Sequence, residues 1–179
     1  MLSPNLLQPT KSTSSRLTMK EKSLVTEEMK AKAEVYYGAE TCRDKFMLLL
    51  ADNGLPLGLL TIHHQDIEEC GYVKELGFVW LKHKEKRELK FDNVDVVFDI
   101  EVTAYFEQNR IKNLTGVKAR EFLIWISLRE IYVNNNSPNG SNITFRTPSG
   151  LSKSFPLSLF QSSHDFKEVK NSKRRIFAL

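Results

Sequence analysis

Cysteine is scarce in this sequence, which has only Cys42 and Cys70 among its 179 residues. Two cysteines cannot form the set of disulfides that stabilises small secreted domains, and neither has a second cysteine at the spacing of a metal-ligand pair. Cys42 falls on the apolar face of an expected helix, which predicts a buried free thiol. The cysteine content therefore excludes a disulfide scaffold.

Long apolar runs are also missing. The longest, residues 47–50 and 122–126, are far shorter than the roughly 20 residues that cross a bilayer as a helix. The N-terminus has no apolar core typical of a secretory signal. We therefore expect no transmembrane segment and a soluble, cytoplasmic protein. The alternative is an organellar protein, because the first twenty residues contain no acid and many Ser and Thr, as transit peptides do.

The central part of the chain carries little net charge. The total is +4, but residues 1–34 and 165–179 carry +2 and +3, which leaves −1 for residues 35–164. A nucleic-acid-binding protein carries its basic residues on the fold, so we expect no nucleic-acid partner. Composition predicts a disordered N-terminal extension (1–22), a single domain (23–160) and a flexible basic C-terminal tail (161–179).

No recognisable catalytic motif is present. The sequence lacks the G-x-S-x-G pattern of serine hydrolases, and Ser141 lies in an expected loop with no helix after it. His63 and His64 are adjacent, so they point to different sides of any regular element and chelate one metal poorly. No two carboxylates are predicted to converge as an acid–base pair. The sequence predicts no catalytic residue, metal or cofactor, and favours a binding protein over an enzyme.

A turn at residues 53–60 separates two hydrophobic patterns. Before it, helical periodicity extends from about Thr26 to Tyr36 and from Glu40 to Asn53. Gly54 favours the conformation that ends a helix. After it, apolar residues alternate, which predicts strands, and helices followed by consecutive strands predict an α+β, mainly β protein with an antiparallel sheet. The expected strands are 66–72, 77–84, 85–91, 101–107, 111–117, 122–133, 143–147 and 151–155.

Nine blocks of the sequence follow one another in order across about residues 23–160. The blocks are 24–28 (LVTEE), 31–36 (AKAEVY), 54–60 (GLPLGLL), 66–69 (DIEE), 77–82 (GFVWLK), 101–105 (EVTAY), 114–119 (LTGVKA), 143–145 (ITF) and 147–152 (TPSGLS). Together they resemble the plant family known as domain of unknown function 538. The chain departs from the family pattern at residues 61–65, where it looks about two residues longer, and at Cys70, where the family has an aliphatic residue.

The resemblance implies an elongated antiparallel sheet curled into a half-barrel, with the N-terminal helix packed in its opening. This fold has been likened to lipid-binding domains of the bactericidal/permeability-increasing type. The resemblance also implies that the protein binds lipid-like or chlorophyll-like molecules or hydrolyses esters.

Five aromatic residues are the candidate ligand-binding residues. A concave apolar face suits an amphipathic small molecule, and Trp and Tyr combine an apolar body with a polar tip. We therefore predict a monomer that binds a hydrophobic or amphipathic small molecule in the concavity of the sheet. The alternatives are an esterase-like hydrolase and a protein-interaction module that uses the charged edge at residues 82–90. The five candidates lie on strands that are apolar on both faces: Phe78, Trp80, Tyr105, Trp125 and Tyr132.

Overall fold

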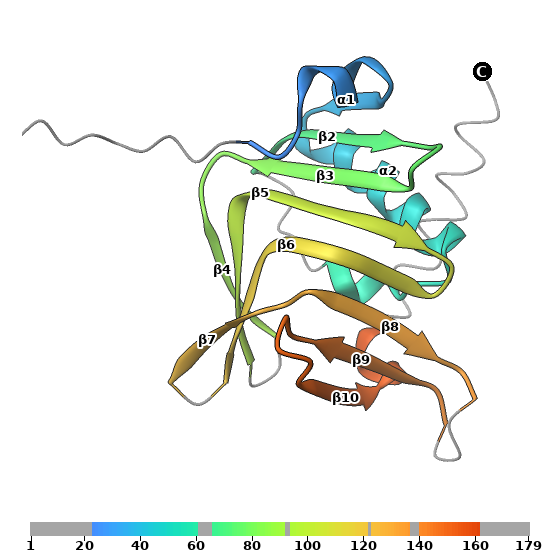
Figure 1. Ribbon diagram of the computed structural model, residues 1–179, viewed down its shortest axis with the longest axis vertical. Coiled ribbons are helices and arrows are strands. Elements are labelled where there is room, and N and C mark those ends of the chain that lie inside the picture. Colours follow the sequence, from blue (N-terminus) through green and yellow to red (C-terminus); the bar gives the residue numbers. More distant parts are fainter. Residues whose placement is uncertain (1–22, 61–65, 92–93, 122, 137–139, 162–179) are drawn as a thin grey trace, which may run out of the picture.

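The computed structural model of the protein describes residues 23–60, 66–91, 94–121, 123–136 and 140–161. Its strands form one open antiparallel sheet, and one long helix lies against a face of that sheet (Figure 1). This arrangement confirms the predicted α+β, mainly β class. The helical elements are α1 (Glu27–Ala31), α2 (Ala39–Asp52) and the short 3-10 turns η1 (Leu57–Leu60) and η2 (Leu157–Phe160). The strands are β1 (Glu34–Tyr37), β2 (Ile67–Val73), β3 (Phe78–His83), β4 (Arg87–Phe91), β5 (Val94–Glu107), β6 (Arg110–Glu121), β7 (Ile124–Ser127), β8 (Glu130–Asn134), β9 (Asn142–Arg146) and β10 (Ser152–Pro156).

The first helix begins where the sequence predicts and ends earlier. Thr26 caps it, because its hydroxyl accepts a hydrogen bond from the backbone N–H of Met29 at 3.2 Å. The helix ends at Ala31, so the predicted continuation to Tyr36 is wrong. That part of the chain forms β1 and pairs with β2, because β-branched and aromatic residues favour a strand where a sheet edge is available.

The second helix, α2, agrees with its prediction. Gly38 (φ +86°) precedes it and Gly54 (φ +67°) follows it, and only glycine adopts these conformations at little cost. The helix lies across one face of the sheet, which we call the concave face (Figure 1). It buries Cys42, Phe46 and Leu50 in the core there.

The sheet bends because β5 and β6 each belong to two parts of it. The end of β5 pairs with β3 and its beginning with β4, while the beginning of β6 pairs with β8 and its end with β7. The register between β5 and β6 shifts between Phe98 and Thr103. Beside this bulge Gly116 has φ +75°, and a Cβ there would lie 2.3 Å from the carbonyl oxygen of Glu101. Because a bulge with a glycine bends a strand, β4, β7 and the adjoining halves of β5 and β6 turn away from the rest of the sheet (Figure 1).

The two faces of the sheet bury different side chains. The concave face packs against α2, η1 and η2 and holds most of the buried apolar residues. The opposite, convex face has a smaller cluster formed by Val25, Val73, Phe78 and Trp80. Residues around α1 cover this second cluster, with Met29 among those packed against it.

Two predicted strands have other bounds in the structure. Strand β5 starts at Val94, seven residues before the predicted position, and the strand predicted over 122–133 is two strands, β7 and β8. At the break, Leu128 donates its backbone N–H to Val117 of β6, and Arg129 donates its own to Arg146 of β9. Predictions for residues 1–22, 61–65 and 162–179 lie outside the described residues. In the described part of the chain, no helix is long and apolar enough to span a membrane.

Candidate functional site

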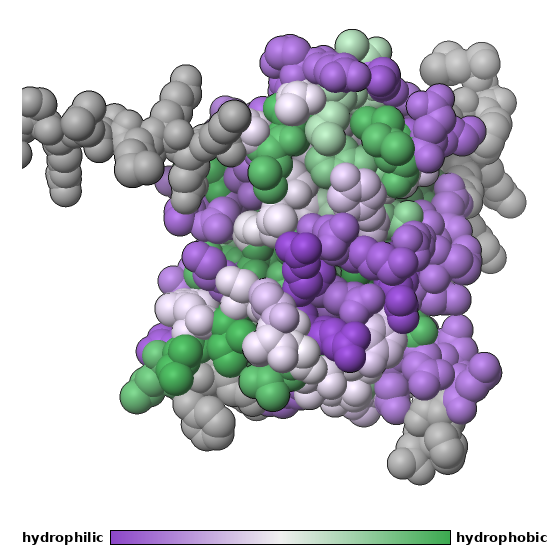
Figure 2. All heavy atoms as spheres, in the orientation of Figure 1, coloured by the Kyte–Doolittle hydropathy of each residue, from purple (hydrophilic) through white to green (hydrophobic). Residues whose placement is uncertain are grey.

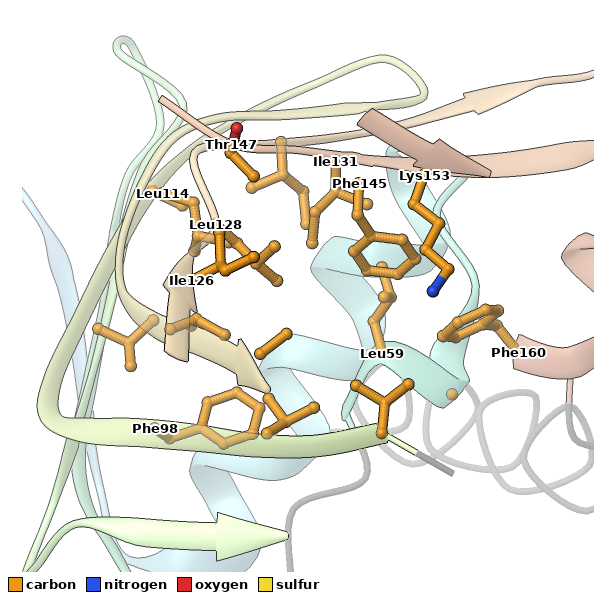
Figure 3. A pocket seen from close by; sticks show the side chains of 18 of the residues that line it. Leu59, Phe98, Leu114, Ile126, Leu128, Ile131, Phe145, Thr147, Lys153 and Phe160 are labelled. Atoms are coloured by element: carbon orange, nitrogen blue, oxygen red, sulfur yellow. The ribbon is translucent and has the colours of Figure 1, made fainter. Parts of the chain in front are cut away.

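An apolar cavity of about 280 Å³ lies on the concave face, between the sheet and the elements that cover it. Strands β3, β5, β6 and β8 form its wall, and η1, β9, β10 and η2 lie across from them. Figure 3 shows side chains pointing into one space, among them Phe98 of β5, Ile126 of β7, Leu128 after β7, and Phe145 of β9. The helix α2 contributes Phe46 and Leu50 to the lining.

The bent part of the sheet supplies its own layer of the wall. Val96 of β5 is in register with Ala119 of β6, and Ala119 is in register with Ile126 of β7. Opposed residues in antiparallel strands share a face, so all three line the cavity together. Val94 and Phe98 lie on the same face of β5 because side chains alternate along a strand.

Polar groups in the wall are few. Thr103 is among the lining residues, and its hydroxyl hydrogen-bonds that of Thr115 at 2.7 Å. The lining residues drawn from the described part of the chain include no histidine and no carboxylate. The other polar lining residues are Arg120, Thr147, Ser152 and Lys153.

The cavity opens to solvent beside β10 and η2. Among its lining residues, Leu151 is 68% exposed and Leu159 is 53% exposed. The rings of Phe145, Phe155 and Phe160 form an aromatic cluster at the same place, with centroids 5.4–6.4 Å apart. The opening therefore combines aromatic surface with nearby cationic and hydroxyl groups, which suits a ligand with an apolar body and a polar end.

The structure places none of the five predicted ligand-binding residues in the lining of this cavity. Phe78, Trp80 and Tyr105 come together on the convex face, where the Phe78 ring lies 6.0 and 5.1 Å from the other two. Tyr132 alternates with two buried core residues of β8 and stacks under Arg110 on the other face. Trp125 lies near the end of β7, beside Arg120. Ligand binding by these five residues stays a prediction, and it would take place on surfaces outside this cavity.

The convex cluster leaves little space for a guest. Gly71 faces Trp80 across the β2–β3 pair, and a Cβ at Gly71 would lie 2.1 Å from the indole ring. The indole N–H donates to Glu69 at 2.9 Å, and Lys30 donates to the same carboxylate at 3.0 Å. Burial alone would raise the pKa of Glu69, but these two hydrogen bonds lower it below its ordinary value. The Glu69 carboxylate thus connects Lys30 of α1 to the sheet, and side chains fill the space between them.

His83 is a buried titratable side chain close to a lining residue of the cavity. It lies at the end of β3 with 2% of its surface exposed, and its ring is 6.4 Å from that of Phe98. Its Nδ1 atom is 3.2 Å from the carbonyl oxygen of Asp99, and no described residue gives Nε2 a partner. Burial lowers the pKa of His83, so the ring is neutral at pH 7.

The other residues considered from the sequence do not meet at one site. Ser141 is exposed just before β9, and its carbonyl accepts the backbone N–H of Leu157 at 2.9 Å. Cys42 and Cys70 are buried free thiols, as predicted for Cys42; their mutual hydrogen bond and burial raise the pKa of Cys70. Among the described residues no group of three or more His, Cys, Asp or Glu side chains could hold a metal ion. His63 lies outside those residues, as does its neighbour His64.

Sequence reasoning missed the aliphatic residues that form the wall. Val94, Val96 and Phe98 recur with a period of two, but the sequence predicts no strand between residues 91 and 101. Val79 and Leu81 lie on the cavity side of β3, whereas the predicted ligand-binding residues of this strand are its aromatic ones, Phe78 and Trp80. The period of two could have identified these wall residues.

Fold and site together define an open, curled antiparallel sheet with one helix against its concave face and an apolar cavity beside that helix. A family model described as "Protein of unknown function, DUF538" matches residues 46–161, and the chain belongs to this family. The predicted family is thereby confirmed. No curated protein and no solved structure matches the chain. The matched residues contain β2 to β10 and the second half of α2, so the cavity wall lies within the family domain.

Proposed function

We propose that this protein binds a hydrophobic or amphipathic small molecule, lipid-like or the apolar tail of a chlorophyll-like molecule, in the cavity on its concave face. The observation that carries the proposal is the cavity itself. Its lining is mainly apolar, and three of its few polar residues, Thr147, Ser152 and Lys153, are close in sequence to the exposed Leu151. Concave, mainly apolar sites with a few placed polar groups are the usual form of small-molecule sites.

The size of the cavity restricts the ligand. Its volume of about 280 Å³ lies at the lower end of the range for small-molecule sites, about 300–1,000 Å³. A single acyl or isoprenoid chain suits such a space, whereas a broad ring system does not. The polar end of the ligand would then lie at the opening, near Lys153 and Thr147, which are lining residues there.

An esterase-like activity is not favoured by this site. A hydrolase needs a base that activates a nucleophile, and the described lining residues include no histidine or carboxylate. Ser141 is not among the lining residues.

A fluorescence assay with cis-parinaric acid tests the proposal on the full chain. Replacing Ala119 by Trp fills the middle of the wall, since Ala119 lies between Val96 and Ile126. We expect the native protein to bind the probe and Ala119→Trp to bind it at least tenfold more weakly. The matched control is Tyr132→Ala on the opposite face, which we expect to keep native affinity.

Two results would contradict the proposal. One is the absence of saturable binding, together with no lipid or pigment in a solvent extract of protein purified from its native tissue. The other is loss of binding in Tyr132→Ala with retention in Ala119→Trp, which would move the ligand to the face carrying the predicted aromatic residues. Circular dichroism of each variant confirms that the fold is kept.

A further inference from the structure

The hairpin that joins β6 to β7 ends in an apolar tip. The two strands pair as far as Glu121 and Ile124, so two residues connect them, and such short turns normally contain Asn, Asp or Gly. Here one connecting residue is Leu123, which is 83% exposed; Ile124 and Trp125 follow at 67% and 38% exposed. We call these three residues the β7 tip.

The β7 tip is apolar on both of its faces. Ile124 lies two residues from Ile126, so it shares the cavity side of the strand, while Trp125 pairs with Arg120 on the other side. The ribbon shows the hairpin projecting from the body (Figure 1). Apolar residues gather at this end in the space-filling view (Figure 2). A projecting patch of this kind marks an interaction site, because soluble proteins seldom leave large apolar side chains together in water.

We infer that the β7 tip inserts into a lipid surface. A stable protein interface buries about 800 Å² and 20–30 residues on each partner, and a tip of three residues does not provide such an area. Shallow insertion into a bilayer needs only a few apolar side chains. Trp is enriched at the membrane–water interface, because its ring is apolar and its N–H is polar.

The charges near the tip indicate which lipid surface it fits. Arg120 is 3.7 Å from Asp95 and Lys118 is 4.0 Å from Asp99. Both cations of the hairpin thus have an acid of β5 nearby, and Asp99 is shared with Lys86 at 2.8 Å. These acids offset the positive charge that would attract anionic lipids. Insertion therefore depends on the apolar side chains and proceeds on zwitterionic lipid.

The hairpin that carries the tip is also part of the cavity wall. Ala119 and Ile126 line the cavity and lie within a few residues of Leu123. A membrane-docked tip would place the cavity next to the source of acyl and isoprenoid chains. The inference that the protein docks on lipid depends only on the β7 tip. The consequence for ligand loading also rests on the proposed function.

The test uses the full chain with phosphatidylcholine vesicles, alone and with a minor fraction of phosphatidylserine. Trp125 reports insertion, because the second tryptophan, Trp80, is fully buried. We expect vesicle flotation and a blue shift of the emission, with affinities within threefold for both vesicle types and little effect of salt. The double variant Leu123→Asn/Ile124→Thr keeps turn and strand preferences and should bind vesicles at least tenfold more weakly.

The matched control is Leu76→Asn, a leucine that is 55% exposed at the turn between β2 and β3, near the other end of β5. It should float with vesicles as the native protein does. Absence of a blue shift with both vesicle types would overturn the inference, and so would equal flotation of the tip variant. A concentration-dependent dimer that the tip variant abolishes, without vesicle binding, would instead assign the tip to a second copy of the chain.

The cavity proposal and the lipid-docking proposal can be refuted independently of each other. Ala119→Trp should lose cis-parinaric acid in solution and keep vesicle binding, whereas the tip variant should keep the probe and lose the vesicles. If the tip variant does not fold, bromine-labelled lipid provides a second measurement on the native chain. Quenching of Trp125 supports insertion, and its absence overturns it.

Discussion

Filling the cavity should stabilise the protein and weaken its ligand binding at the same time. The perturbation is Ala119→Leu, which adds three carbon atoms at a half-buried position of the wall, between Val96 and Ile126. Each buried methylene contributes about 0.8 kcal/mol, so we expect the free energy of unfolding to rise by roughly 2 kcal/mol. For a domain of this size that corresponds to a rise in Tm of roughly 5–10 °C.

The assay combines urea unfolding with titration of cis-parinaric acid. The gain arises because the added atoms enter existing space, which a close-packed core does not offer. The matched control is Ser127→Leu, one residue beyond Ile126 on the exposed side of β7. It adds a similar apolar side chain outside the cavity and should change stability by no more than about 0.5 kcal/mol. Probe affinity should fall only in Ala119→Leu.

The reasoning would be refuted if Ala119→Leu lowered stability by about 1–3 kcal/mol, the cost of overpacking a filled core. It would also be refuted if Ala119→Leu bound the probe as tightly as the native protein. In either case the wall of the bent strands would be packed by the protein's own side chains, and a ligand would have no access to it.

Two further predictions concern the convex face and the buried histidine. Gly71→Ala should lower the free energy of unfolding by about 1–3 kcal/mol, because its Cβ would lie 2.1 Å from the Trp80 ring; urea unfolding and a shifted tryptophan emission check this, and native values would contradict it. Burial lowers the pKa of His83 in the folded state, so between that value and about 6.5 the unfolded chain binds the extra proton and stability falls as pH falls. Unfolding at pH 7.5 and 5.5 should show a loss of up to about 1.4 kcal/mol per pH unit that is absent in His83→Asn, and identical pH dependence of the two proteins would contradict the prediction.

The sequence predicted the fold better than the site. Alternation along β3 separated Phe78 and Trp80 from Val79 and Leu81, and the structure keeps this separation. The pattern alone does not say which set faces the cavity, because both faces of the strand are covered. That depends on the α1 segment, which covers the convex face through contacts such as Lys30 with Glu69, far apart in sequence.

The bend of the sheet was the second feature that local patterns did not reveal. It arises from a register shift between β5 and β6 and from Gly116 at positive φ opposite Glu101. A glycine between alternating residues is compatible with a flat strand or with a bulge. Which of the two occurs depends on the partner strand. The apolar residues at the start of β5 therefore could not be assigned to a buried wall from the sequence alone.

The geometry of the sheet explains why a cavity persists beside a well-packed core. α2 has 14 residues, which at about 1.5 Å per residue span about 21 Å, and its lining contacts are confined to Phe46 and Leu50. Beyond its end the bent strands continue with apolar side chains on the same face, covered only at the margin by η2 and the β9–β10 hairpin. Larger side chains at Ala119 would close this space and stabilise the fold, so small residues here favour an unfilled interior over maximal stability. An unfilled interior is expected where a site must accept a ligand. This expectation distinguishes the apolar wall from a core that is merely packed incompletely.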